Sequence, residues 1–226
     1  MCHNFGNMEG EIMDLPTTAG GLLRASNVYC VGRNYAEHAT ELGNEVPEEP
    51  LLFLKSTAAL RGLQPGSLAY ESETFHHEIE LVVIMTEQRA LYSKQGWRGA
   101  GYISLGLDLT RRKKQSKLKS QGHPWTTAKS FAGSAIIAPL IPIDQFNTLS
   151  SIKFSLSVNQ SQRQWGDTAS MIFPVPDLID FLCTSHELMA GDVIFTGTPK
   201  GVSDIRKGDQ FTLKFEDLPY SFSGEV

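Results

Sequence analysis

The sequence is poor in cysteine, and the three that it has, Cys2, Cys30 and Cys183, show no paired spacing. An odd count without a CxxC pattern predicts neither a disulfide framework nor a cysteine-ligated zinc site. Cys30 lies in the apolar run of residues 28–31, so we expect it to be a buried free thiol. Reduced cysteines favour a reducing compartment, and we predict that the protein is cytoplasmic.

Long apolar runs and an excess of positive charge are also missing. No segment approaches the roughly 20 apolar residues that a membrane-spanning helix needs, and the first residues lack the basic and apolar regions of a signal peptide. The 20 lysines and arginines are outnumbered by 25 aspartates and glutamates, which gives a formal net charge of −5. We therefore expect no membrane and no nucleic-acid partner, because an acidic chain without a basic tract contacts phosphates poorly. The negative net charge is still compatible with a small anionic ligand if a few lysines or arginines lie together at its binding site.

Glycine-rich nucleotide-binding motifs, internal repeats and low-complexity tracts are absent too. A chain of 226 residues with 41% hydrophobic residues is long enough for one domain with a single core. We predict an N-terminal extension over residues 1–26 and one main domain over residues 27–226. Many short strands with few helices predict an α+β fold rather than a doubly wound parallel sheet. The expected strands are 27–32, 51–54, 77–85, 102–110, 154–158, 163–165, 193–195 and 210–215. The polar turn around Asn159 and Gln160 predicts a hairpin between the strands 154–158 and 163–165. The expected helices are 34–43 and 176–185, and 111–121 is expected to be a helix or an exposed loop.

Two glutamates mark one end of the strongest predicted strand. Residues two apart in a strand share a face, so Glu78 and Glu80 point the same way, ahead of residues that are apolar on both faces. Asp108, near the end of the next predicted strand, could add a third carboxylate. Neighbouring carboxylates beside a buried strand repel each other, and a divalent cation would relieve that repulsion. Three carboxylates without cysteine favour Mg²⁺ or Mn²⁺, with Ca²⁺ possible. The alternative is an ordinary strand end whose glutamates face water or pair with lysines.

Other polar residues could carry catalysis. His38 and Glu41 are three apart in a predicted helix that Asn34 is placed to cap, so the carboxylate could orient the imidazole as a general base for water. The alternative is an exposed helix face with incidental polar neighbours. Arg112 belongs to a basic run that could clamp a substrate carboxylate or form a solvated face. Lys129 stands among small and apolar residues, where it could stabilise an enolate or carboxylate, or be a surface lysine.

Several ordered segments together resemble the fumarylacetoacetate hydrolase family, most closely its short, single-domain members of the acylpyruvase and oxaloacetate-decarboxylase type. The resemblance runs from about residue 27 to the C-terminus. The segments that carry it are CVGRNYAEH at 30–38, LFLK at 52–55, HHEIE at 76–80, LDLT at 107–110, AKSF at 128–131 and GDVIFTGTPKGV at 191–202.

The resemblance implies a role for each matched position. Glu78, Glu80 and Asp108 would bind the metal, His38 and Glu41 would form a water-activating dyad on a lid, and Lys129 would stabilise enolate charge. Arg112, Gln115 and Thr198 would contact the substrate. The implied fold is a mixed, strand-rich roll of several small sheets with few helices, in a protein that commonly forms a homodimer. The chain departs from the family pattern at Lys113, which replaces an acidic neighbour of Arg112, and at Ser56, which replaces a proline.

These features predict a divalent-metal-dependent hydrolase that cleaves the C–C bond of acylpyruvates, which are small 2,4-dioxo acids. The same site could serve an oxaloacetate decarboxylase or an isomerase or tautomerase of 2-hydroxy-dienedioates. An alternative of another class is a non-catalytic, cation-binding homodimer. A zinc hydrolase using His76 and His77 is less favoured, because these adjacent histidines lack the HExxH spacing and three carboxylates are a harder ligand set than zinc prefers.

Overall fold

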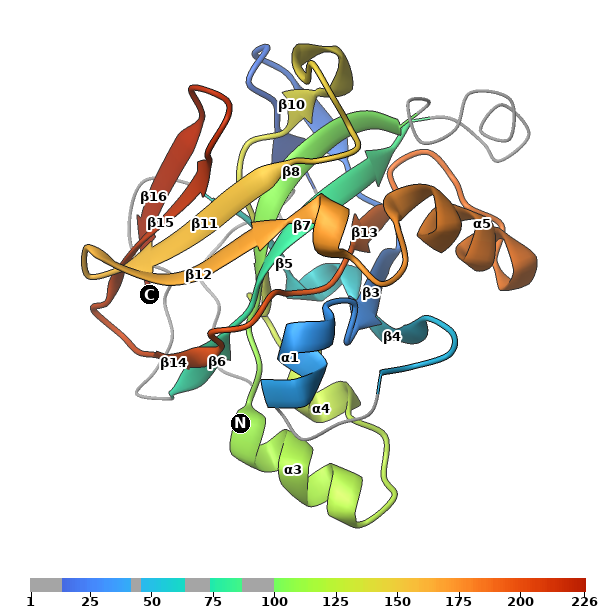
Figure 1. Ribbon diagram of the computed structural model, residues 1–226, viewed down its shortest axis with the longest axis vertical. Helices are drawn as coiled ribbons and strands as arrows, with labels where there is room; N and C mark the ends of the chain where they lie inside the picture. The colour runs from blue at the N-terminus through green and yellow to red at the C-terminus, as the bar shows by residue number, and fades with distance from the viewer. Residues whose placement is uncertain (1–13, 42–45, 64–73, 87–99) are drawn as a thin grey trace.

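The computed structural model describes residues 14–41, 46–63, 74–86 and 100–226. The centre of the fold is an eight-stranded sheet whose main path runs β4-β3-β13-β7-β8-β9-β5, with β10 paired to β8 (Figure 1). Its strands are β3 (Val28–Gly32), β4 (Leu51–Lys55), β5 (Leu60–Gly62), β7 (Ile79–Met85), β8 (Ala100–Asp108), β9 (Ala135–Ile137), β10 (Ile141–Pro142) and β13 (Val193–Phe195). Every residue of β7 is buried, which agrees with its apolar character on both faces.

A second, antiparallel sheet packs against β7 and β8 and encloses the larger hydrophobic core with them. Its order is β12 (Ser161–Asp167), β11 (Lys153–Val158), β15 (Gln210–Phe215) and β16 (Ser221–Glu225). The side chains of Phe211, Leu213 and Phe215 alternate into the core, as a sheet with one solvated face requires. Asn159 and Gln160 adopt positive φ between β11 and β12, which is the backbone of a tight type I′ hairpin turn, so the predicted hairpin is confirmed.

Two small two-stranded sheets complete the strands. One pairs β6 (Phe75–His77) with β14 (Ser203–Ile205). The other, β1 (Asp14–Pro16) with β2 (Leu22–Arg24), lies in the predicted N-terminal extension, where residues 1–13 fall outside the described part. Leu15 is fully buried in the second hydrophobic core. The described part of this extension is therefore packed onto the main sheet.

The described helices are α1 (Ala36–Glu41), α3 (Arg112–Ser120), α4 (Thr126–Lys129) and α5 (Val175–Ser185). The first three lie together at the lower end of the molecule in Figure 1. Residues 112–120 are thus helical rather than an exposed loop, and the strand before them ends at Asp108 instead of at residue 110. A strand-rich fold with few helices confirms the predicted α+β class. None of the helices in the described residues is long and apolar enough to cross a membrane.

The predicted helix cap at Asn34 is wrong. The Asn34 amide instead donates to the carbonyl oxygens of Thr196 and Phe173, at 2.8 and 3.0 Å, and its oxygen accepts from the Phe173 N–H at 2.8 Å. These contacts connect the start of α1 to the loop after β13.

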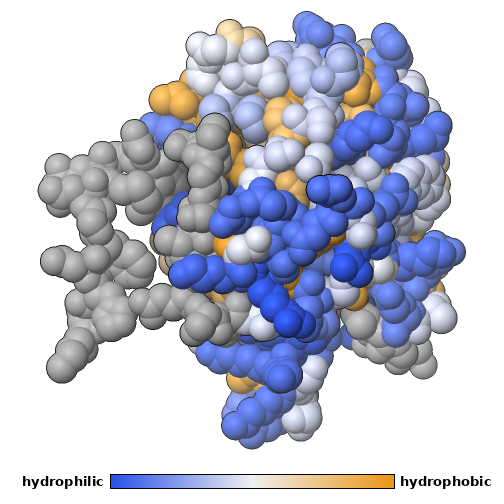
Figure 2. Space-filling model, turned by 90° about the vertical axis from the view of Figure 1, so that its left-hand side faces the viewer, coloured by the Kyte–Doolittle hydropathy of each residue, from blue (hydrophilic) through white to orange (hydrophobic). Residues whose placement is uncertain are grey.

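The surface on the side of β14, β15 and β16 is mostly hydrophilic (Figure 2), as expected for the solvated face of the second sheet.

Candidate metal and substrate site

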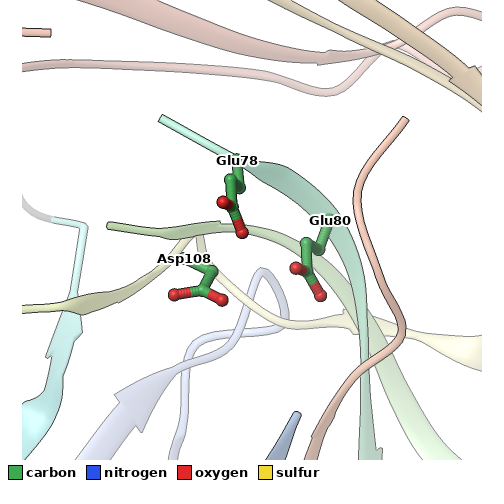
Figure 3. A group of neighbouring side chains, drawn as sticks. All are labelled: Glu78, Glu80 and Asp108. Atoms are coloured by element: carbon green, nitrogen blue, oxygen red, sulfur yellow. The ribbon is translucent and has the colours of Figure 1, made fainter. Parts of the chain in front are cut away.

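Three carboxylates converge where β7 and β8 meet. The Asp108 N–H donates to the Glu78 carbonyl oxygen at 2.9 Å, so these residues face each other across the antiparallel ladder. Side chains of directly opposed residues lie on the same face of a sheet, and Glu80 shares that face because it is two residues from Glu78. Figure 3 shows the three carboxylates turned toward one shared space. The strand register therefore brings together the side chains that the sequence singled out.

The chemistry of this trio suits a divalent cation. Oxygen atoms of Glu78, Glu80 and Asp108 all lie within 4.8 Å of one another, and all three residues are buried. Burial raises the pKa of Glu80 well above its usual range, and repulsion from Asp108 and Glu78 raises it further. Asp108 also has a buried carboxylate oxygen, Oδ1, without a hydrogen bond of good geometry. A hard cation with oxygen ligands would stabilise such a cluster.

Two cations already contact part of the trio. The Lys129 Nζ lies 2.7 Å from a Glu78 oxygen and 2.6 Å from an Asp108 oxygen, and the Arg112 guanidinium pairs with the other oxygen of Glu78. Burial by itself raises the pKa of Glu78, but Lys129 and Arg112 outweigh it and hold the pKa well below its usual range. Burial likewise opposes the charge of Lys129, but Asp108 and Glu78 raise its pKa above the usual value. Lys129 is thus a buried, charged lysine at the end of α4 rather than a surface one.

Lys55 is a third cation at this site, and the sequence reasoning gave it no role. Its buried Nζ lies 2.8 Å from Asp108 Oδ1 and donates to the carbonyl and hydroxyl oxygens of Ser134, at 3.0 and 3.1 Å, and to the carbonyl of Lys129. The LFLK segment at residues 52–55 contributes to the family resemblance. Its lysine follows an apolar run, however, and nothing in that local pattern indicates which residues it will contact. Lys55 connects a carboxylate of the trio to the backbone that holds Lys129.

Replacing Lys55 with methionine is expected to lower the free energy of unfolding by roughly 3 kcal/mol, because Asp108 loses one of its two buried cationic partners. Urea denaturation in the presence of EDTA measures this loss. The deficit should shrink when Mg²⁺ is added, since the cation restores positive charge beside Asp108. Lys207→Met removes an exposed lysine and serves as the control. A loss below about 1 kcal/mol would contradict a structural role for the buried pair.

The predicted dyad lies on α1. The Nδ1 atom of His38 is 3.4 Å from Glu41 Oε2, and the Glu41 carboxylate also accepts from the Gly201 N–H at 3.1 and 3.2 Å. His38 is buried and lines the same cleft as the carboxylates, whereas Glu41 is exposed behind it. Glu41 therefore lies between the His38 imidazole and the loop of residues 196–201 that follows β13, in a position to orient the ring.

The same cleft, of about 430 Å³ including open solvent at its mouth, is lined by every predicted site residue except Glu41. Arg112 is oriented by hydrogen bonds to Gln115 Oε1 at 2.7 Å and to His76 Nδ1 at 3.2 Å, and the neighbouring Lys113 is exposed. Thr198 Oγ1 accepts from Gln164 at 2.9 Å. The lining residues without a predicted role are Val31, Gly32, Arg33, Leu51, Phe53, Lys119 and Trp125.

The adjacent histidines do not form a metal site in the described residues. His77 is fully buried and is held by Gln164 Oε1 at 2.9 Å and Ser203 Oγ at 2.8 Å. His76 contacts Arg112 and lies 3.2 Å from an Asp204 oxygen. These contacts give both rings a structural role, and the described chain assembles no other group of metal-ligating side chains than the carboxylate trio.

Comparison with known proteins gives consistent findings. The family model "Fumarylacetoacetate (FAA) hydrolase C-terminal" matches residues 27–221. Oxaloacetate tautomerase YcgM of Escherichia coli is 41% identical over 93% of this chain and 94% of its own length. The mitochondrial oxaloacetate decarboxylase of Dictyostelium discoideum is 40% identical over 80% of this chain and 84% of its own. Fumarylpyruvate hydrolase from Pseudomonas aeruginosa, solved in complex with Mn²⁺ and pyruvate, has a TM-score of 0.86 at 32% identity, covering 94% of each chain.

Proposed function

The chain belongs to the fumarylacetoacetate hydrolase family and is an enzyme of that family, and from this premise we propose that it catalyses divalent-metal-dependent enolate chemistry on small 2-oxo acids. The observation that carries the proposal is the convergence of three buried carboxylates, the His38–Glu41 pair and Lys129 on one cleft. Glu78, Glu80 and Asp108 would hold Mg²⁺ or Mn²⁺. When bound there, the cation supplies Lewis-acid polarisation of the 2-oxo group and positive charge beside the substrate carboxylate.

In hydrolysis of an acylpyruvate, His38 accepts a proton from water while the water oxygen bonds to the C4 carbonyl carbon. The C3–C4 bond then breaks, and its electron pair stays on C3 as the enolate of pyruvate. Lys129 donates its N–H groups to the oxygen that becomes negative, which lowers the barrier because the donor is already oriented. His38 returns the proton to C3, so the products are pyruvate and the carboxylic acid. Arg112, Gln115 and Thr198 would position the substrate from the cleft walls.

Oxaloacetate is the second candidate substrate, and the relatives favour it. The Escherichia coli and Dictyostelium discoideum proteins, about 40% identical to this chain, are named for oxaloacetate tautomerisation and decarboxylation, whereas the fumarylpyruvate hydrolase is 32% identical. Tautomerisation needs a base that moves a proton between C3 and the enol oxygen, which His38 can also perform. Decarboxylation needs stabilisation of the enolate but no attacking water. We therefore expect oxaloacetate to be turned over at least as efficiently as acylpyruvates.

A metal-supplemented activity panel tests the proposed function. Acylpyruvates, enol and keto oxaloacetate, and 2-hydroxy-dienedioates are assayed with Mg²⁺ or Mn²⁺ and after stripping with EDTA. Metal-dependent turnover of at least one acid is expected. Undiminished turnover after stripping would overturn the metal-dependent mechanism, and metal binding without turnover across the panel would favour the non-catalytic alternative.

The hydrolytic rate is expected to hold to a lower pH than an ordinary histidine base would allow. Burial lowers the pKa of His38 below its usual value of about 6.5, although the charges of Glu78 and Glu41 partly oppose this. A protonated His38 cannot accept a proton, so the rate falls only as the pH drops through that lowered pKa, and a bound dication would lower it further. A pH profile of kcat/KM measures the acidic limb, which Glu41→Gln should move lower still. An acidic limb above pH 7 would contradict His38 as the base.

Further properties remain part of this proposal. We place the protein in the cytoplasm, although some relatives are mitochondrial, and we propose a homodimer. Trp165, exposed on the edge strand β12, is a candidate contact between the two copies. Sedimentation velocity tests the oligomeric state, and fractionation of the source cells tests the compartment.

A further inference from the structure

The outer part of the cleft carries two cationic side chains that the proposed mechanism does not use. Arg33 and Lys119 both line the cleft, and among the described residues neither forms an ion pair with a carboxylate. The inner cations differ, since Lys129 and Arg112 are paired with the carboxylate trio. Arg33 and Lys119 are therefore positive charges in a substrate cleft that remain available to a bound anion.

The geometry of α3 places Lys119 outward from the trio. Arg112, Gln115 and Lys119 are spaced i, i+3 and i+7, so they share the face of the helix that lines the cleft. Seven residues advance the helix by about 10 Å, while helical side chains lean back toward the N-terminus, which here means toward Arg112. The Lys119 Nζ lies 4.5 Å from the centre of the Trp125 ring, which restrains it at the cleft.

Arg33 lines the cleft from a different part of the fold, the turn between β3 and α1. Its φ of 58° lies in the left-handed region, which side chains other than glycine rarely occupy and which is found at binding sites where the surrounding structure enforces it. Arg33 and Lys119 line the same cleft, so an anion bound there can contact both. Burial lowers the pKa of Lys119 and repulsion from Arg33 lowers it further, and a bound anion would relieve that repulsion.

We propose that Arg33 and Lys119 bind a second carboxylate of the substrate, so that the enzyme prefers 2-oxo dicarboxylic acids to monocarboxylic acids of the same length. A guanidinium and an ammonium bind carboxylates through charge-assisted hydrogen bonds. The inference rests on the proposed function, because it assumes that the first carboxylate and the 2-oxo group bind at the inner, trio end of the cleft. Neither Arg33 nor Lys119 takes part in the bond-breaking step; they determine specificity.

Binding of an unreactive matched pair tests this subsite without requiring turnover. 2-Oxoglutarate and 2-oxopentanoate have the same carbon chain but differ in the distal carboxylate. Isothermal titration of the Mg²⁺-loaded protein should show a preference for 2-oxoglutarate of roughly tenfold or more. Arg33→Gln and Lys119→Gln should each reduce the preference, and the double variant should bring the two affinities within about twofold.

The control variant is Lys117→Gln, which removes the same charge from an exposed position of α3. It should keep the wild-type preference, because only a local contact and not the overall charge of the helix is proposed to matter. If it reduces the preference as much as Lys119→Gln does, a general electrostatic effect replaces the proposed subsite. Thermal unfolding tests whether each variant is folded. If Arg33→Gln does not fold, the binding preference of Lys119→Gln alone tests the proposed subsite.

A turnover experiment separates failure of this inference from failure of the proposed function. Keto–enol tautomerisation is compared for oxaloacetate and for its 4-methyl ester, which cannot be decarboxylated, with the wild type and the Gln variants. Loss of kcat/KM for oxaloacetate, with the ester unaffected, supports the subsite, whereas equal losses for both overturn it. If the wild type turns over neither acid yet still prefers 2-oxoglutarate in binding, the proposed function fails and the distal subsite stands.

Discussion

Replacing Glu80 with glutamine is expected to abolish metal-dependent turnover while leaving the metal-free protein about as stable as the wild type. Glu80 is buried, and its Oε2 accepts the Gly197 N–H at 2.7 Å, but no lysine or arginine of the described chain forms an ion pair with it. Glutamine keeps an acceptor for Gly197 and resembles the protonated carboxyl that the raised pKa of Glu80 favours when no cation is bound. Without a cation, the substitution therefore costs little stability.

Although Glu80→Gln costs the metal-free protein little stability, we expect it to weaken metal binding and catalysis strongly. Removing one of three carboxylate ligands should lower the affinity for Mg²⁺ or Mn²⁺ by about 100-fold or more. Turnover should fall by roughly 10³-fold, because a Lewis acid contributes several kcal/mol and each 1.4 kcal/mol corresponds to a factor of ten. Calorimetric titration with Mn²⁺, urea denaturation in EDTA and the substrate panel measure the three quantities.

Two further variants separate the loss of metal binding from a loss of stability and provide a control. Asp108→Asn should lose metal binding and turnover to a similar extent, but it should also destabilise the metal-free fold, because Lys55 and Lys129 would then face an uncharged amide. Glu187→Gln makes the same chemical change as Glu80→Gln at an exposed position and should alter none of these properties. Wild-type, Mg²⁺-dependent turnover by the Glu80→Gln protein would contradict the metal assignment.

Replacing His38 with glutamine is expected to separate the reactions that share the cleft. Hydrolysis of acylpyruvates should fall by about 10²- to 10⁴-fold, the range typical of a lost general base. Decarboxylation of oxaloacetate should survive much better, because it needs the stabilised enolate but no activated water. Keto–enol tautomerisation should fall if His38 is the group that moves the C3 proton. Parallel assays of the three reactions on one protein preparation measure the difference.

The control for this variant lies on the same helix. Glu37 is exposed on α1 and, within the described part of the chain, pairs with Lys200 alone, at 3.0 Å, so Glu37→Gln should leave all three reactions near the wild-type rate. Glu41→Gln should have an intermediate effect on hydrolysis, since it weakens the orientation of His38 but keeps the ring. An unchanged rate of acylpyruvate hydrolysis in His38→Gln would remove His38 from the mechanism and leave enolate stabilisation as the main catalytic effect.

The elements that the sequence predicted well are those whose local pattern is strong. The continuous apolar run from residue 79 to 85 became the buried strand β7, and the positive-φ pair Asn159–Gln160 became the predicted hairpin turn. The boundaries were predicted less well, since the strand before Arg112 ends at Asp108 and the helix expected from residue 34 begins at Ala36, while residues 42 and 43 of that expected helix lie outside the described part. Asn34 was misassigned as a cap because its amide serves contacts to Thr196 and Phe173, far away in sequence.

By itself, the sequence determined which residue types could do chemistry and which of them share a local face. The two-residue spacing of Glu78 and Glu80 and the three-residue spacing of His38 and Glu41 are properties of strand and helix geometry, so they could be read before any fold was known. Only the tertiary structure decided that Asp108 faces Glu78, because strand register depends on pairing between distant segments. The same holds for the pairing of Lys55 with Asp108 and for the presence of Arg33 and Lys119 in one cleft, because these residues come from different elements of the fold. A lysine or arginine in a sequence carries no mark of what it will face, since that is fixed by packing, and here packing decides which cations pair with the carboxylates and which remain for the substrate.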